Sequence, residues 1–249
     1  MNMVFGVGMA KTGTHALAAL FRDSLRCAHE PGAEALMNLV LHHHAGRIRR
    51  TEFLQFVRQL VDRMDLELNV SQINGCLIEA LVESYPHAKF ILTVRDCESW
   101  MRSFINHQLS RRLPPGSAWP AFRDFRFRPA EHPPRAEDAP LTANGLYGLE
   151  AYAAYWVRHN RSVLAAIPAG RLLIVPMVKL QEDAAAIGAF VGAGATRLSS
   201  EFSFQGIYVE SPFDRLERGY VEEQIASSTG EVLSLCMDIR RTARHEVAS

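Results

Sequence analysis

The sequence has no excess of charge of either sign, because 27 Lys and Arg residues are balanced by 27 Asp and Glu residues in a chain of 249. A chain without net charge has no general attraction for nucleic acid or for an acidic membrane surface, so any site for an anion must be local. The sequence also contains no apolar run near the roughly 18 residues that a membrane helix needs. We therefore expect no nucleic-acid partner and no membrane span.

Cysteine is scarce, and its four residues are spread along the chain at positions 27, 76, 97 and 236. They form no CxxC pair and show no spacing typical of metal ligands. Their neighbours are mostly apolar, which predicts reduced and largely buried thiols of the kind found in cytoplasmic proteins. The N-terminal residues also lack the basic segment with which a secretory signal peptide begins. The expected location is the cytoplasm, and no bound metal is expected.

The composition is that of an ordinary globular protein, with 48% apolar and 22% charged residues. A chain of this length can bury one large core, and we predict a single domain over residues 1–249. Strands are predicted at 3–5, 26–31 and 89–94 and, with a preceding turn, in 167–175, while 69–72 is either a short strand or a connector. The remaining periodic stretches predict helices at 16–21, 33–44, 51–66, 73–84, 97–104, 145–167, 183–191 and 220–241, with Thr51 and Asp96 as N-caps.

The sequence lacks the GK[ST] signature of the common nucleotide phosphate-binding loop. It has instead a glycine-rich stretch, Gly6–His15 (GVGMAKTGTH), between the apolar 3–5 run and the helix-prone 16–21 run. A strand, tight loop and helix in this order direct backbone N–H groups and the positive end of a helix dipole at one point. This geometry is typical of a phosphate site.

The residue types of this loop fit the same interpretation. Glycines at positions 6, 8 and 13 allow the backbone to approach an anion closely. Lys11 adds a mobile positive charge, and Thr12 and Thr14 add hydroxyl donors. The alternative is a glycine-rich turn that binds nothing, with its lysine side chain in solvent.

Residues 113–143 differ in character from the rest of the chain, since they hold seven of the twelve prolines and interleave Phe and Trp with Arg. A long stretch without periodicity is usually a functional lid or disordered. Its aromatic residues favour the first alternative, and we predict that the segment is a lid that closes over a bound substrate. In the later 145–167 helix, the face that carries Tyr152, Trp156 and His159 is interpreted as core packing, with a contact to adenine or acceptor as the alternative.

Two segments resemble the sulfotransferases that use 3′-phosphoadenosine 5′-phosphosulfate (PAPS). The first is the Lys-Thr-Gly-Thr loop at 11–14, and the second is the strand FILTVRD at 90–96, followed by a helix with Ser103 eight residues after Arg95. The likeness runs from about residue 4 to 192. It implies one α/β domain with a doubly wound central parallel sheet flanked by helices, the P-loop nucleotide-kinase-like sulfotransferase fold.

The resemblance implies transfer of a sulfuryl group from PAPS to a hydroxyl or amine, without a metal. Lys11 would neutralise the charge that builds on the bridging oxygen as the S–O bond breaks. Arg95 and Ser103 would bind the 3′-phosphate. The 5′-phosphate would be held at the start of the first helix by Thr12, Gly13, Thr14 and His15.

A general base must take the proton of the acceptor, and three residues are candidates. Glu30 is favoured because it stands at the exit of the second strand, where some family members carry a glutamate, and His29 is beside it. His107, one turn beyond Ser103, is the third. The 69–74 segment, where many family members place an Asp or His, contains neither, and Met177–Leu180 departs from the family's usual Tyr-Glu-Asp-Leu element.

Two other functions remain open from the sequence. A magnesium-dependent small-molecule kinase would explain a phosphate loop but needs the missing GK[ST], and a catalytically inactive nucleotide-binding module would keep Lys11 and Arg95 but lack a base. The acceptor can be a small molecule, a carbohydrate or a lipid, because no residue pattern encodes its identity. The oligomeric state is equally open.

Overall fold

The computed structural model describes residues 3–111, 113–194, 210–226, 230–232 and 234–237. These residues divide into two compact units. The first comprises the described residues within Met1–Arg95, Ser162–Ser203 and Cys236–Ser249, and the second those within Asp96–Arg161 and Phe204–Leu235. The assignment of the whole chain to one domain stays a prediction.

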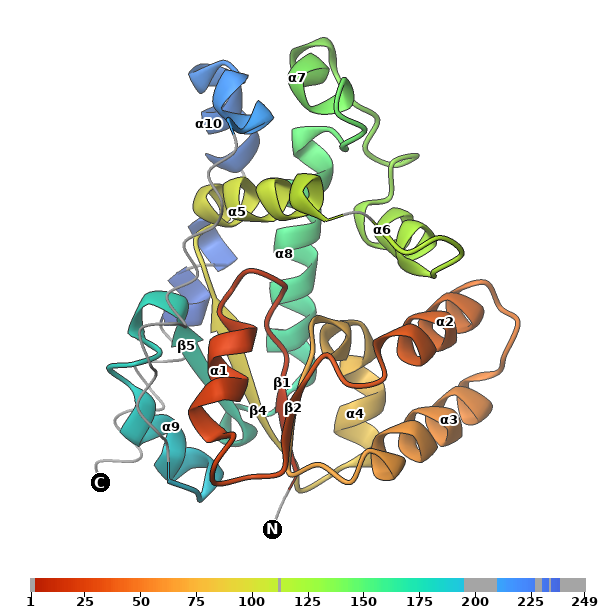
Figure 1. Ribbon diagram of the computed structural model, residues 1–249, viewed down its shortest axis with the longest axis vertical. Coiled ribbons are helices and arrows are strands. Elements are labelled where there is room, and N and C mark those ends of the chain that lie inside the picture. Colours follow the sequence, from red (N-terminus) through yellow and green to blue (C-terminus); the bar gives the residue numbers. More distant parts are fainter. Residues whose placement is uncertain (1–2, 112, 195–209, 227–229, 233, 238–249) are drawn as a thin grey trace. The chain divides into compact units, whose positions relative to one another are not determined.

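The first unit is built on a five-stranded sheet in which every strand pairs in parallel with its neighbour (Figure 1). The strands are β1 Val4–Gly6, β2 Cys27–His29, β3 Leu68–Val70, β4 Lys89–Val94 and β5 Leu172–Pro176. Their order in the sheet is β2-β3-β1-β4-β5. The α/β class with a central parallel sheet flanked by helices is thus confirmed. Each of the five strands overlaps a segment in which a strand was predicted.

The alternation of side chains along β1 explains how helices are held against the sheet. Val4 belongs to a buried cluster with Leu17 of helix α1 (Thr14–Phe21) and Ile187 of helix α9 (Ala184–Val191). Phe5, which is fully buried, stacks on the ring of Phe90 in β4 at a centroid distance of 5.6 Å. Successive residues of a strand point to opposite faces, so β1 anchors cores on both sides of the sheet.

The sheet reverses its winding direction between β1 and β4. From β1 the chain passes through α1 to β2 and β3 on one side, whereas after β4 it reaches β5 on the other. Ligands of open parallel sheets bind beyond the carboxyl ends of the strands at such a reversal. Lys11 follows β1 and Arg95 follows β4, so the topology brings the two predicted phosphate segments to this edge.

The other helices of the first unit follow the predicted pattern with differences at their ends. They are α2 Ala33–His44, α3 Arg50–Arg63, the 3-10 turn η1 Gln72–Leu77 and α4 Ile78–Ser84, with the short turns η3 Ala169–Arg171 and η4 Met177–Lys179 around β5. The predicted cap at Thr51 is wrong, because the N-cap of α3 is Arg49, whose backbone N–H donates to Oε2 of Glu52 at 2.9 Å. The Glu52 carboxylate also accepts from the Arg49 guanidinium, so a charged pair three residues apart holds the start of α3.

The second unit is helical in the residues described. It contains α5 Cys97–Ser110, α6 Trp119–Phe127, η2 Ala136–Asp138, α7 Ala139–Thr142, the part of α8 (Leu149–Ala166) up to Arg161, η6 Pro212–Arg215 and α10 Arg218–Ala226. Asp96 caps α5 as predicted, since its Oδ1 accepts the backbone N–H of Ser99 at 2.9 Å. Of the predicted helix at 220–241, residues 227–229, 233 and 238–241 lie outside the described residues, as does the connector at 195–209.

The lack of regular structure expected for residues 113–143 is wrong, because α6, η2 and α7 lie within this segment. Arg126 is 2% exposed, and its guanidinium carbon lies 4.7 Å from the ring centroid of Phe122 and 5.5 Å from that of Tyr155. The Phe and Arg alternation is therefore an i, i+4 face of a short helix packed into an aromatic core. Pro120 lies in the first turn, where a helix tolerates proline. The lid role stays a prediction.

The aromatic face of α8 packs in the core, as its spacing predicted. Tyr152, Trp156 and His159 are all buried. The Tyr152 hydroxyl donates to Oε1 of Gln108 on α5 at 2.6 Å, which satisfies a polar group that would otherwise be costly to bury. The Phe127 ring of α6 lies 4.7 Å from the Tyr152 ring. The second unit is thus held together by aromatic packing among α5, α6 and α8.

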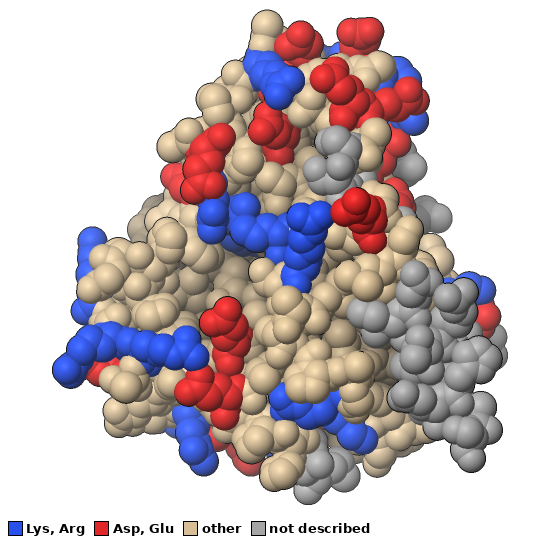
Figure 2. Space-filling model, turned by 180° about the vertical axis from the view of Figure 1, so that it is seen from behind, with Lys and Arg blue, Asp and Glu red and all other residues tan. Residues whose placement is uncertain are grey.

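Charges of both signs occur on the molecular surface. On the face drawn in Figure 2, Lys and Arg side chains and Asp and Glu side chains form separate small groups. Throughout the described part of the chain, every helix falls short of the combination of length and apolar character needed to span a bilayer.

The cysteines give a first testable prediction. All four are free, and burial raises the pKa of Cys27 to about 11, that of Cys236 to about 12 and that of Cys97 further. The thiolate is the reactive form, so at pH 8 only about one thousandth of Cys27 is ready to react. Iodoacetamide should therefore modify these three cysteines far more slowly in the native protein than in urea, as followed by mass spectrometry. Equal rates in the two states would contradict the burial.

Candidate active site

The loop from Gly6 to His15 requires glycine at two positions, one for lack of space and one also for its backbone conformation. A Cβ atom on Gly8 would lie 2.0 Å from Oγ1 of Thr93, so any side chain there would collide with β4. Gly13 has a φ of 95°, in the left-handed region that favours glycine, and a Cβ there would lie 2.6 Å from Cδ1 of Leu180. Lys11 also has a positive φ, of 70°. A left-handed lysine in a glycine-rich loop is a local strain of the kind that collects at functional sites.

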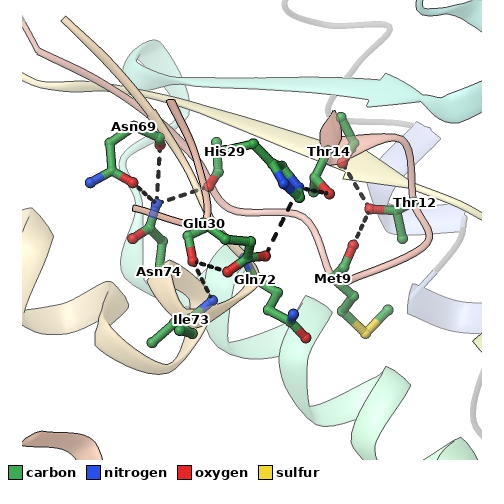
Figure 3. A network of polar contacts seen from close by, with 12 residues as sticks. Met9, Thr12, Thr14, His29, Glu30, Asn69, Gln72, Ile73 and Asn74 are labelled. Carbon is green, nitrogen blue, oxygen red and sulfur yellow. Dashed lines mark hydrogen bonds and ion pairs between the residues drawn. The ribbon is translucent and has the colours of Figure 1, made fainter. Parts of the chain in front are cut away.

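Thr12 shapes this loop from within. Its hydroxyl donates to the carbonyl oxygen of Met9 at 2.7 Å and lies 2.8 Å from Oγ1 of Thr93 (Figure 3). Its backbone N–H also donates to the Met9 oxygen, at 3.3 Å, and the residue is fully buried. Because both of its donors are used inside the loop, we assign Thr12 to holding the loop in shape against β4.

Lys11 and Arg95, which the sequence places 84 residues apart, are in contact. Nη1 of Arg95 donates to the backbone oxygen of Lys11 at 3.4 Å and lies 4.0 Å from Sδ of Met177. Both side chains are half-buried. The Arg95 guanidinium thus lies against the backbone of the loop that carries Lys11, beyond the carboxyl ends of β1 and β4, where a cationic group favours an anionic ligand.

Helix α1 begins at this point. Its N-cap is Gly13, which has no side chain to cap the first amide groups. The hydroxyl of Thr14 lies 3.1 Å from Nε2 of His29, at the end of β2. The ring of His15, which is exposed, stands edge-on to the His29 ring at 5.0 Å. The start of α1 therefore presents backbone donors, while the Thr14 side chain links the helix to β2.

His29 and Glu30 lie together at the exit of β2, as predicted. Nε2 of His29 is 4.0 Å from Oε1 of Glu30. The Glu30 carboxylate accepts the hydroxyl of Ser71 at 2.7 Å and the backbone N–H of Gln72 at 3.1 Å. Figure 3 shows Glu30 between His29 and the first residues of η1. Glu30 has a left-handed φ of 55°, a second strained position at this edge of the sheet.

Two further predicted residues belong to the second unit. Ser103 and His107 both lie on α5 and are half-buried, and the His107 ring is 6.5 Å from the ring of Phe104. The pairing of Arg95 with Ser103, and the role of His107 as an alternative base, stay predictions.

Reasoning from the sequence missed three polar residues that organise this edge. Ser71 contacts Glu30, Thr93 contacts Thr12, and Asn74 donates from Nδ2 to the carbonyl oxygens of Gly6 and Asn69 at 3.0 and 3.1 Å. Asn74 is fully buried, so these bonds satisfy the ends of β1 and β3. A polar residue directly after a buried strand is the one signal that could have marked Ser71 in advance.

Met177–Leu180, which departs from the family pattern, packs against the loop. Cγ of Met177 and Cδ1 of Leu180 are the atoms nearest to a Cβ built on Gly13. Among the residues that the structure describes, His, Cys, Asp and Glu side chains form no group of three or more that could hold a metal ion.

Comparison with known proteins adds a family assignment. Residues 3–182 match the sequence model of the family described as the sulfotransferase domain. This range includes the loop Gly6–His15, the residues at the ends of β2 and β4, and β5. No curated protein matches the chain.

Among solved structures, a sulfotransferase from Alicyclobacillus acidocaldarius aligns with a TM-score of 0.53 at 14% identity, over 95% of this chain and 96% of that one. The sulfotransferase STF1 from Mycobacterium tuberculosis H37Rv aligns with a TM-score of 0.46 at 15% identity, over 90% of this chain and 76% of that one. At 14% identity, the first alignment supports the fold alone.

Proposed function

The chain belongs to the sulfotransferase family, and on this premise we propose that it transfers a sulfuryl group from PAPS to a hydroxyl or amine of a small-molecule, carbohydrate or lipid acceptor. Family membership and fold support sulfuryl transfer as the general activity. The PAPS donor, the acceptor class and the residue roles below are the proposal.

The observation that carries the proposal is the contact between Lys11 and Arg95 at the start of α1. One residue comes from the loop expected to hold the 5′-phosphosulfate and the other from the strand end expected to hold the 3′-phosphate. A nucleotide phosphorylated at the 3′ and 5′ positions of its ribose needs a cationic residue for each phosphate, and this contact brings the Arg95 guanidinium, a good phosphate ligand, to the loop that carries Lys11. The residues present therefore fit a bisphosphorylated donor.

The residues of this edge have complementary roles in the proposed mechanism. The Gly13 and Thr14 amides and the α1 dipole bind the 5′-phosphate, with His15 at the rim. When bound, PAPS supplies an activated sulfuryl group whose leaving group is a phosphate. The Lys11 ammonium neutralises the negative charge that develops on that leaving oxygen, and Arg95 with Ser103 fixes the 3′-phosphate.

Glu30 is the proposed general base. Each carboxylate oxygen has two lone-pair sites, so the bonds from Ser71 and Gln72 leave capacity to accept the acceptor's proton. His29, which lies between Thr14 and Glu30, is the second candidate, and we propose that it orients Glu30 or receives the proton in its place. His107 is the third.

A magnesium-dependent kinase and an inactive nucleotide-binding module are the competing functions. The loop has Lys11 two residues before Gly13 and no GK[ST], which disfavours the kinase. The carboxylate of Glu30 at the strand edge disfavours the inactive module, because it supplies a base. Turnover with PAPS in the presence of EDTA would separate the proposed activity from both.

Binding of the reaction's nucleotide product tests the proposed donor. Calorimetry with 3′,5′-adenosine bisphosphate, without magnesium, should show specific binding that weakens about 10- to 100-fold in Arg95→Ala, since a charged hydrogen bond contributes about 1.5–3 kcal/mol. Binding of 5′-AMP, which lacks the 3′-phosphate, should be weak in the wild type and little changed in the variant.

The matched control is Arg58→Ala, which removes an exposed arginine that pairs with Asp62 on α3. It should bind the bisphosphate like the wild type. Tighter binding of ATP with magnesium than of the bisphosphate would refute the donor and favour the kinase.

We also propose a cellular location and a class of partner for this protein. The four free cysteines support a cytoplasmic location, and the partner expected is an acceptor substrate rather than a nucleic acid.

A further inference from the structure

Ser71 connects the donor loop to the proposed base. Its backbone N–H donates to the carbonyl oxygen of Gly6, the last residue of β1, at 3.2 Å. Its hydroxyl donates to Oε2 of Glu30 at 2.7 Å. Ser71 is fully buried, so its own two donors are shielded from bulk water. One residue thus joins the strand that leads into the loop to the carboxylate at the exit of β2.

The direction of the Ser71 hydroxyl is determined by its other partner. Ser71 caps the 3-10 turn η1, and its Oγ accepts the backbone N–H of Ile73 at 3.1 Å. A hydroxyl has one proton to donate, and an ionised carboxylate can only accept. With Oγ already accepting from Ile73, the proton of Ser71 points to Glu30.

The backbone of Glu30 is held by the same segment. Its N–H donates to the carbonyl oxygen of Val70 at 2.8 Å, and its Oε1 accepts the N–H of Gln72 at 3.1 Å. Glu30 is therefore attached to three successive residues, Val70 to Gln72, by one backbone and two side-chain bonds. A left-handed φ of 55° persists only where surrounding contacts determine it, and these bonds supply such contacts.

We infer that Ser71 is a positioning residue for the reaction: it holds the Glu30 carboxylate in one orientation relative to the loop Gly6–His15 and stabilises its ionised form. The inference rests on the proposed function, in which Glu30 takes the acceptor's proton. Ser71 itself touches neither donor nor acceptor in this role. It keeps the base aligned and charged until the acceptor's proton is transferred.

The pH profile gives the decisive readout. A donor bonded to a carboxylate favours the charged form, so its removal makes protonation easier and moves the acidic limb of kcat/KM to higher pH. In Ser71→Ala we expect an upward shift of about one pH unit, as follows from losing one charged hydrogen bond. Titratable groups near Glu30 include His29, at 4.0 Å, and His15 beyond it. Both are unchanged in the variant, so the shift reports Ser71.

The experiment measures kcat and KM between pH 5 and 9, about the range over which carboxylates and histidines act as bases, for wild type, Ser71→Ala and Ser71→Thr. Ser71→Ala should lose about tenfold or more in kcat at low pH with little change in the KM for PAPS, and Ser71→Thr, which keeps a hydroxyl, should recover most of it. Ser24→Ala is the matched control, since Ser24 donates only to the backbone oxygen of Phe21 at the end of α1. Bisphosphate calorimetry on each variant checks that the donor site is intact.

A second measurement does not depend on turnover. ¹³C NMR of the glutamate carboxyl groups, with the Glu30 signal identified by its loss in Glu30→Gln, should show the Glu30 titration displaced to higher pH in Ser71→Ala. An active wild type with neither the acidic limb nor the NMR titration moved would overturn the role of Ser71 alone. A wild type that transfers no sulfuryl group would instead refute the proposed function, and this inference with it.

Discussion

Glu30→Gln should lower kcat by about 10²- to 10⁴-fold, the usual contribution of a general base, while 3′,5′-adenosine bisphosphate binds as in the wild type. The amide is close in size to the carboxylate: its oxygen can accept from Gln72, and its NH₂ can donate to the second lone pair of the Ser71 oxygen, although the Ser71 proton then loses the carboxylate as its acceptor. The substitution therefore removes basicity with little change of structure. Steady-state kinetics with PAPS and an acceptor, together with calorimetry, measure the two quantities separately.

The control for this change is Glu34→Gln, which neutralises an exposed carboxylate in the first turn of α2 only four residues away. It should cost no more than the few tenths of a kcal/mol expected of an exposed charge at a helix start. If Glu30→Gln keeps full turnover, Glu30 is removed from the mechanism. His29→Gln and His107→Gln then become the variants to compare, because these two residues are the remaining candidates.

Lys11→Met should reduce kcat by about 10²- to 10³-fold, the size of effect seen when one preorganised donor to a developing negative charge is lost. Methionine keeps the length of the side chain and, like lysine, carries a Cβ, so the left-handed backbone at φ 70° is no more strained than before. The loss should fall on kcat more than on bisphosphate affinity, since the product has no sulfuryl group in transfer. Single-turnover kinetics would isolate this step.

Lys179→Met is the matched control, because Lys179 is an exposed residue of η4 whose ammonium pairs with Glu182. Its kcat should remain within about twofold of the wild type, as expected for the loss of a surface ion pair. A Lys11→Met protein as active as this control would show that the loop binds an anion without stabilising the transition state. The proposed role of Lys11 would then be wrong even if the donor is PAPS.

Local signals in the sequence were sufficient for most strands of the first unit and for the start of helix α5 in the second. The strand Lys89–Val94 and the cap at Asp96 were predicted where they occur, because a continuous apolar run and a side-chain cap depend on adjacent residues. The segment 113–143 was misjudged, since its prolines hide the short helix α6, which is held by the burial of Phe122 and Phe127 in an aromatic core. The cap of α3 was misplaced because Arg49 and Glu52 form it as a charged pair.

In the candidate site, the residues could be predicted from the sequence, whereas their contacts could not. Lys11, His29, Glu30 and Arg95 could be named from the sequence, because each lies at the end of a strand or in the loop after it, and the carboxyl ends of parallel strands share one edge. The contact between Lys11 and Arg95 depends on β1 and β4 being neighbours, with Gly6 opposite Ile91. The contact of Glu30 with Ser71 depends on β2 pairing with β3 so that His29 stands opposite Val70.

What the sequence determined by itself is the chemistry available at the ends of the strands: a glycine-rich loop with a lysine, an acid and a histidine, and an arginine. Backbone conformation, helix caps and apolar periodicity are local properties, so they can be read from neighbouring residues. Only the tertiary structure decided which of these groups meet and which polar residue holds the base. Strand order and register are long-range choices made by the packing of the whole sheet, and no single segment encodes them.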